Sequence, residues 1–512
     1  MHPRLIGSFA AITFALLLAV WLGVQVGSGA HGILIALVFG TVGLLILVQT
    51  QRHHEAMLLA LILLPGRGLL LGGLGYWDAL AFGVIALWAL KTLTVKQSLP
   101  PVKGQLTFWA AVVFCGILVG HFVANRLGVG TGSQGGLRLA VLGILTVAAC
   151  GLIQSGAISD EGNRAIPILG LLPGIFDASI EVINHVIPSA RIITYNIYTS
   201  INWEVLASMT GGGRGGDIRM AGLRVLGLSL GLLCCARYAT TRSRSAENYG
   251  FLYLGALMAA ALVLFAGYRG HFLMLMIVYL VAVWVRSRYS AFWLALTGVA
   301  SAGMLSLFHS YVFSLPKTVQ RSLSWFPGQW DPDVVAAVSG GWYWRRELWS
   351  RFMSTNFPAH PWFGQGLRYV ESATHRAFEY IWAPELFFVD KQLLHSGFFS
   401  SLDYVGIVGT CALAALSLRG FYNCYILLGR HRRQLTPWMV WVIAYFMARQ
   451  CTFWVTGFFD VSFMPLSICA AVIEVSRTQL SPSQLLHGHT PARAKTTGGA
   501  GRATRASESS SE

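Results

Sequence analysis

The sequence predicts an all-α polytopic membrane protein with about 12–14 transmembrane helices and one large, partly helical outer loop. Of its 512 residues, 55% are hydrophobic and only 11% are charged, which is more apolar surface than a soluble core of this size can bury. The apolar residues are also gathered into runs long enough to cross about 30 Å of hydrocarbon. Both observations indicate an integral membrane protein.

The predicted spans follow one another along most of the chain. They lie near residues 5–27, 32–50, 56–73, 77–95, 106–124, 137–155, 165–186, 221–238, 249–267, 271–285, 290–308, 397–418, 437–457 and 460–476. Two are weak, because LPGRG interrupts 56–73, as in a broken or re-entrant helix, and 271–285 is short. The first run is too long for a signal-peptide core and lacks a convincing cleavage site, so we expect it to be a span rather than a removed leader.

The net charge of +16 follows the predicted topology. Basic residues gather in short segments between apolar runs, for example QRHH at 51–54, KTLTVK at 91–96 and GRHRR at 429–433. The positive-inside rule therefore places both termini in the cytoplasm. This distribution does not indicate nucleic-acid binding, and the eight cysteines, which show no metal-ligand spacing, predict neither a zinc site nor a disulfide framework.

The chain divides into four parts by composition. Residues 1–308 are predicted to form a bundle of about eleven spans with a small outer loop at 187–220, and residues 309–394 a large outer loop. Residues 395–476 are predicted to add about three spans, and the polar residues 477–512 a disordered cytoplasmic tail. The amphipathic spacing of YWRRELWSRFM (343–353) predicts a helix within the large loop. We therefore expect the functional site at the outer face.

One histidine stands at the start of an apolar run, in LLHSGFFSSLDYVGIVGTCAL (393–413). If the segment is helical from His395 onward, Gly406 and Gly409 follow at +11 and +14 and share one stripe with the histidine. Glycines on one stripe let another helix approach closely, so the stripe is expected to face protein. Histidine, whose unperturbed pKa is near 6.5, suits proton transfer at such a position. The alternative is a histidine that caps the helix or anchors it at the interface.

Further motifs precede this histidine. GGWYWRRELWSRF (340–352) carries an arginine pair on a Trp-rich segment, and HPWFGQGLRYV (360–370) places Gly364 and Gly366 in a tight turn after Pro361. This ordered set resembles the C-terminal signature of the bacterial O-antigen ligase and polysaccharide polymerase superfamily. HS, nine residues and GIVGT (395–410) are similar to the His-[Asn/Ser/Gln]-x9-Gly-x-x-Gly pattern of O-antigen ligases. The resemblance covers residues 340–413 at the level of motifs, and elsewhere it rests on topology.

The resemblance implies a GT-C-like, metal-independent glycosyltransferase without a cofactor. Such an enzyme takes a glycan from undecaprenyl diphosphate at the periplasmic face of the bacterial inner membrane, in O-antigen (lipopolysaccharide) or exopolysaccharide biosynthesis. A ligase would transfer the glycan to lipid A core, and a polymerase would extend another glycan; polysaccharide assembly proteins are possible partners. If a base removes the acceptor proton while the acceptor attacks opposite the leaving group, the configuration inverts.

Carried onto this sequence, the resemblance makes His395 the matched histidine and Arg345 or Arg346 the loop arginine that binds the diphosphate. Arg269, in AGYRGHF, stands where the family often has Ser-Arg-Gly, with Tyr268 in place of the serine. Arg219, in GGDIRMAG, is a fourth candidate by position. Guanidinium groups suit this role because they bind phosphate oxygens bidentately and remain cationic in a semi-dry crevice. Structural and helix-packing roles are expected for four glycines, Gly364, Gly366, Gly406 and Gly409.

Other polar and aromatic residues leave alternatives open. Asp331 and Asp333 in WDPDVV could bind a cation, but a proline between two aspartates favours a turn, so no metal site is predicted. Further carboxylates could act as bases or bind the acceptor: Glu371, Glu379, Glu385, Asp390 and Asp403. Five tryptophans could stack on sugars or anchor the loop at the interface: Trp325, Trp330, Trp342, Trp344 and Trp349.

Two other classes of function remain open, a transporter or flippase of lipid-linked glycans and a noncatalytic component of an envelope assembly. A transporter is expected to show related halves and ionisable residues near mid-membrane. In this sequence the ionisable residues gather at the outer boundary, and the halves show no repeat. The transferase is therefore favoured.

Overall fold

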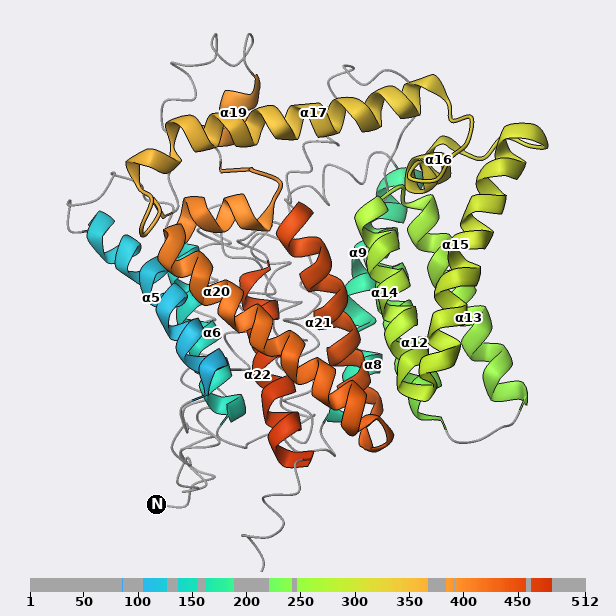
Figure 1. Ribbon diagram of the computed structural model, residues 1–512, viewed down its shortest axis with the longest axis horizontal. Helices are drawn as coiled ribbons and strands as arrows, with labels where there is room; N and C mark the ends of the chain where they lie inside the picture. Colours follow the sequence, from blue (N-terminus) through green and yellow to red (C-terminus); the bar gives the residue numbers. More distant parts are fainter. Residues whose placement is uncertain are drawn as a thin grey trace, which may run out of the picture.

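The computed structural model describes residues 85, 105–126, 137–154, 163–187, 221–241, 246–366, 384–390, 392–456 and 462–480. Within these ranges the regular elements are helices and there is no strand (Figure 1). The all-α prediction is thus confirmed for the residues that the structure describes. The first four predicted spans, apart from Ile85, lie outside the described residues, as do residues 188–220 with Arg219.

Apolar helices form a bundle. They are α5 (Leu106–Arg126), α6 (Leu137–Gln154), α8 (Ile166–Leu169), α9 (Leu172–Val186), α12 (Ala221–Thr240), α13 (Ala246–Phe265), α14 (Arg269–Arg286), α15 (Arg288–Tyr311), α20 (Gly397–Arg430), α21 (Pro437–Thr456) and α22 (Phe463–Leu480). Among the described residues, six segments are long and apolar enough to cross a membrane: α5, α8 with α9, α12, α14, α15 and α20. This is consistent with a membrane protein, while the span count of the whole chain stays a prediction.

The apolar runs predicted from residue 106 onward all coincide with helices. The short run 271–285 is the core of the 18-residue helix α14, and the run 397–418 continues to Arg430. The predicted tail begins four residues too early, because α22 extends to Leu480. Leu480 packs against the hydrophobic core, which favours helix at these positions.

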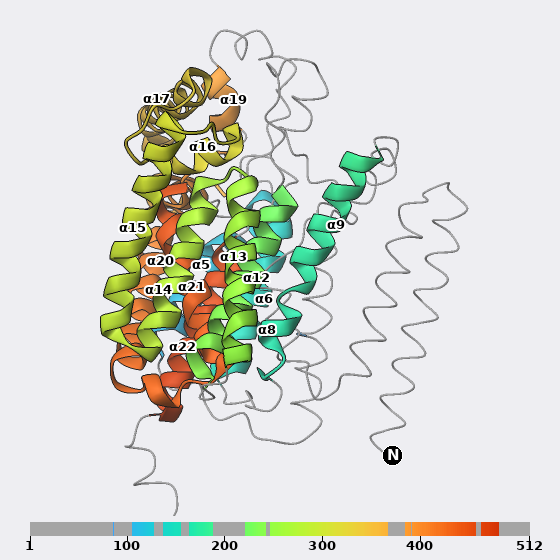
Figure 2. The same cartoon turned by 90° about the vertical axis from the view of Figure 1, so that its right-hand side faces the viewer.

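Three further helices come from the predicted large loop: α16 (Lys317–Leu323), α17 (Pro332–Thr355) and α19 (Pro384–Asp390). The loop also contains the short 3₁₀ helix η3 (Phe357–Ala359), and a second one, η5 (Arg432–Gln434), connects α20 to α21. Figures 1 and 2 show α16, α17 and α19 at one end of the bundle, where α17 runs across the other helices. We call this the α17 end. Residues 343–353, expected to be helical, lie within α17.

Helix α17 has two different faces. Asp331 caps its first turn by accepting a hydrogen bond from Asp333 N, and Pro332 occupies the first helical position. Leu348 and Phe352 are buried on the inward face, in a cluster that includes Leu394, just before α20, and Leu402 in its first turns. The outward face leaves Trp342 and Tyr343 exposed.

The core of the bundle is centred on α21. Its large side chains are fully buried, among them Trp438, Trp441, Tyr445, Phe446 and Phe453. This helix packs against α12, α14, α20 and α22, whereas α15 exposes apolar side chains such as Phe292 and Leu296 along its length. The exposed apolar surface of α15 is what a lipid-facing helix presents.

Candidate functional site

Helix α20 is broken at Gly406, where the backbone has φ 63° and ψ −167°. Residues 361–366 fill the break with their own backbone. Four hydrogen bonds join the two segments: Gln365 N to Asp403 O (2.8 Å), Gly366 N to Tyr404 O (3.2 Å), Ile407 N to Pro361 O (2.8 Å) and Val408 N to Trp362 O (3.0 Å). We call residues 361–366 and 403–408 the junction. The loop therefore satisfies backbone groups that the broken helix leaves unpaired.

The predicted packing glycines make the junction possible. A Cβ atom on Gly364, where φ is +72°, would lie 2.6 Å from Asp403 O, and one on Gly406 would collide with the backbone nitrogen of Gly364. A Cβ atom on Gly366 would lie 2.8 Å from His121 Cβ of α5, and one on Gly409 would lie 3.3 Å from Ile117 Cδ1 of the same helix. The sequence led us to expect that Gly406 would allow the close approach of a second helix. The structure shows that it allows the close approach of a loop backbone instead.

His395 lies in a turn before α20 and not in the helix. Helix α20 begins at Gly397, after the extended N-cap Ser396, and His395 has a left-handed φ of 51°. The prediction that His395, Gly406 and Gly409 share one helical stripe is therefore wrong. Two local departures from helical geometry cause the difference, the turn at His395 and the break at Gly406.

The half-buried His395 ring packs against two aromatic side chains that also contact each other. It meets Trp344 edge to face at 5.3 Å between centroids and lies 5.9 Å from Phe388. The backbone on each side is also fixed. Trp349 Nε1 of α17 donates to Leu394 O (2.8 Å), and Ser396 Oγ donates to Trp454 O of α21 (3.0 Å). Helices α17 and α21 thereby hold the position of the imidazole.

The structure separates the two arginines that follow Trp344. Arg345 is half-buried and Arg346 is exposed. Phe352, seven residues after Arg345 and so within about 20° of it around the helix, is buried against the start of α20. Arg345 therefore lies on the inward face with the residues that contact the His395 segment, and Arg346 lies on the outward face.

Arg351 is a further half-buried arginine that sequence reasoning missed. It follows Trp344 by seven residues and shares its direction around α17 to within about 20°. Because Trp344 contacts His395, Arg351 is on the face of α17 turned toward the histidine. The seven-residue spacing of a tryptophan and an arginine on an amphipathic segment is the signal that could have found it.

Arg269 is the first residue of α14, a helix that packs against α16. A Cβ on the nearby Gly267 would be 3.5 Å from Thr318 of α16. Arg224 of α12, which was not singled out from the sequence, places its guanidinium over the Tyr268 ring at 4.0 Å. Tyr268, in place of the expected serine, thus packs on a second arginine.

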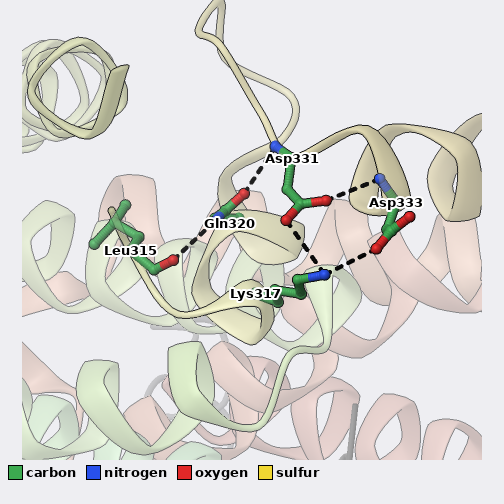
Figure 3. A network of polar contacts seen from close by, with 5 residues as sticks. All are labelled: Leu315, Lys317, Gln320, Asp331 and Asp333. Carbon is green, nitrogen blue, oxygen red and sulfur yellow. Dashed lines mark hydrogen bonds and ion pairs between the residues drawn. The ribbon is translucent and has the colours of Figure 1, made fainter. Parts of the chain in front are cut away.

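Asp331 and Asp333 hold a lysine between them (Figure 3). Lys317 Nζ lies 3.3 Å from Asp331 Oδ2 and 2.9 Å from Asp333 Oδ2. The hydrogen bond from Asp333 N, followed by Lys317, holds the pKa of the Asp331 carboxyl below its usual value, and the hydrogen bonds to Asp333 and Asp331 raise the pKa of Lys317. Among the described residues, no group of three or more His, Cys, Asp or Glu side chains could bind a metal ion.

The other candidate carboxylates differ in position. Asp403 is 2% exposed and accepts a hydrogen bond from Gln365 Nε2 within the junction. Asp390 is buried at the end of α19. Glu371, Glu379 and the side chain of Glu385 lie outside the described residues.

The α17 end combines groups suited to acid–base chemistry and to anion binding. An imidazole can accept a proton from a hydroxyl group, and guanidinium groups neutralise phosphate oxygens. Trp344, which contacts His395, belongs to the same helix as the half-buried Arg345 and Arg351. Comparison with protein-family models and with curated proteins finds no match for this chain.

Proposed function

We propose that this protein is a GT-C-like glycosyltransferase that moves a glycan from undecaprenyl diphosphate to an acceptor at the α17 end. In this proposal the α17 end is the periplasmic face of a bacterial inner membrane. The observation that carries the proposal is the contact of Trp344 with His395. This contact joins α17, the helix that carries the half-buried arginines, to the turn that carries His395, at one end of an apolar bundle. The junction supports it further, since it connects the Pro-x-x-Gly-x-Gly and Gly-x-x-Gly motifs.

In the proposed reaction His395 removes the proton of the acceptor hydroxyl. The acceptor oxygen forms a bond to the anomeric carbon as the bond to the diphosphate oxygen breaks on the opposite face, so that the configuration inverts. The leaving undecaprenyl diphosphate keeps the bonding electrons, and arginine guanidinium groups stabilise its growing charge. Arg345 is assigned to this role in preference to Arg346 because of its inward face. The acceptor is lipid A core for a ligase, and another glycan for a polymerase.

The test is a transfer assay with the full-length protein in liposomes containing an undecaprenyl-diphosphate-linked glycan and an acceptor. His395→Ala is expected to lower kcat by about 10²–10⁴-fold, the range for loss of a general base. His360→Ala is the matched control, because His360 is an exposed histidine of the same loop. Undiminished transfer by His395→Ala would rule out the assigned role.

Transport of a lipid-linked glycan is a second candidate because of one ion pair. Arg419 Nε of α20 lies 2.9 Å from Glu474 Oε1 of α22, within apolar helices. The expectation from the sequence that ionisable residues gather at the outer boundary is wrong for this pair. Ionisable residues within membrane helices are a feature of transporters. Exchange of a fluorescent lipid-linked glycan between liposome leaflets tests this candidate. Exchange that requires Glu474 but not His395 would favour transport over transfer.

A further inference from the structure

Gln392 is a buried polar residue in the turn that carries His395. It is 3% exposed, and its Nε2 donates a 2.7 Å hydrogen bond to Gly366 O. Gln392 and His395 have φ values of 57° and 51°, and among the described residues no other non-glycine residue has a positive φ. Such a conformation persists where the surrounding structure fixes it.

The backbone at Gln392 ends helix α19. Leu393 N donates to Phe388 O (2.8 Å) and Gln392 N donates to Val389 O (3.0 Å). This pair of hydrogen bonds terminates a helix around one left-handed residue, which is usually glycine. The backbone alone would therefore favour glycine at 392, and the glutamine supplies something that glycine lacks, an amide that reaches Gly366.

The partner of this amide belongs to the junction. Gly366 N donates to Tyr404 O of α20, while Gly366 O accepts from Gln392. Gly366 thus contacts the chain on both sides of His395, through its carbonyl at the residue three positions before it and through its N–H at the residue nine positions after it. The hydrogen bond of Gln392 connects the histidine turn to the broken helix.

We propose that Gln392 is a positioning residue for His395. Its amide fixes the turn against the junction, and the turn in turn fixes the imidazole against Trp344. The inference deepens the proposed function, on which its catalytic consequence rests, while the placement of the ring can be measured without any transfer reaction.

Gln392→Gly separates positioning from stability, because it removes the amide and relieves the left-handed backbone. The full-length variant in nanodiscs is expected to melt at the same temperature as the parent or higher. Its rate of His395 modification by diethyl pyrocarbonate, followed by peptide mass spectrometry, should rise several-fold above the parent rate. In the transfer assay kcat should fall about 10- to 100-fold, with a smaller change in donor KM.

Gln392→Asn is the companion variant, because asparagine tolerates the left-handed region but is one methylene too short to reach Gly366. It should show the same kinetic loss as Gln392→Gly. An unchanged rate of His395 modification in both variants would overturn the proposal, whether or not the parent transfers glycan. If the variants change the rate of His395 modification but the parent transfers no glycan, the positioning role is supported and the proposed function is overturned instead.

Discussion

Two of the buried carboxylates, those of Glu474 and Asp403, are held in different ways. Glu474 is 2% exposed and is bound by side chains from three other helices: Arg419 of α20, Thr107 of α5 and Gln154 of α6. Asp403 is also 2% exposed, but the segments that meet around it are joined mainly through their backbones. We call the first group the Glu474 cluster.

The difference indicates different roles. A charge within an apolar bundle must be paired, and the Glu474 cluster pairs it by connecting four helices at one point. The junction instead satisfies a broken helix by inserting a loop, which bends α20 and sets the position of its first residues. We infer that the Glu474 cluster stabilises the bundle, while the junction shapes the α17 end.

The largest effect is expected from Gly406→Ala. Gly406 has a backbone conformation that is almost confined to glycine, with a penalty of about 1–3 kcal/mol for other residues. The collision of the new methyl group with the inserted loop adds a further cost of about 1–3 kcal/mol or more, so the total is expected to exceed the loss from breaking one buried ion pair. Thermal unfolding in detergent should show a lower melting temperature, and limited proteolysis should cut residues 361–366 faster.

Gly341→Ala in α17 is the matched control for this substitution. A Cβ there meets no atom within 4 Å, and alanine is favoured over glycine in a helix by about 0.5–1 kcal/mol. The control should melt at the parent temperature or slightly above it. Equal melting temperatures for Gly406→Ala and Gly341→Ala would contradict the backbone role of the junction.

Glu474→Ala should give the next largest loss, because it leaves Arg419 without its carboxylate. Breaking a buried pair by removing one partner costs about 3–5 kcal/mol of unfolding free energy. The double variant with Arg419→Met should lose less than the sum of the single losses, as expected for contacting residues. Donor KM of the folded fraction should stay at the parent value. A raised KM would connect the cluster to the site and weaken the contrast with the junction.

The sequence is informative about the bundle because apolar runs report burial or lipid contact directly. Each run from residue 106 onward is helical, although the run 165–186 is divided into α8 and α9. The pair of Arg419 and Glu474 was missed, since single charges within apolar runs do not reveal that they meet across 55 residues. Periodicity also assumes regular helix, and so it could not predict the left-handed turn at His395 or the break at Gly406.

The motifs of the candidate site were visible in the sequence, but their connections were not. Gly364 and Gly406 were singled out as structural glycines, whereas their mutual contact depends on backbone hydrogen bonds between segments about 40 residues apart. The choice between Arg345 and Arg346 required the direction of α17 relative to α20, which no local pattern provides.

The arginine pair gives a smaller, purely kinetic contrast at the α17 end. Arg345→Ala should raise donor KM or lower kcat/KM by about tenfold or more, the loss expected for one charge-assisted hydrogen bond of about 1.5–3 kcal/mol. Arg345→Lys should recover part of the loss, because lysine keeps the charge but not the bidentate geometry. Arg346→Ala should change kcat/KM less than twofold. Equal losses at both positions would show that the face of α17 does not decide donor binding.

The smallest effect is expected at the start of α17, from Asp331→Asn. The pKa of Asp331 is lowered in the folded protein, so its ionised form adds stability above the unfolded value of about 4, and this contribution disappears as the pH falls through the lower folded pKa. Asparagine keeps the capping oxygen and removes only the charge that faces Lys317. The parent should therefore melt slightly above the variant at pH 7, and the two should converge below pH 4. Glu347→Gln removes an exposed charge elsewhere on α17 and is the control for net charge. A loss at pH 7 equal to that of Asp331→Asn would assign the effect to net charge instead.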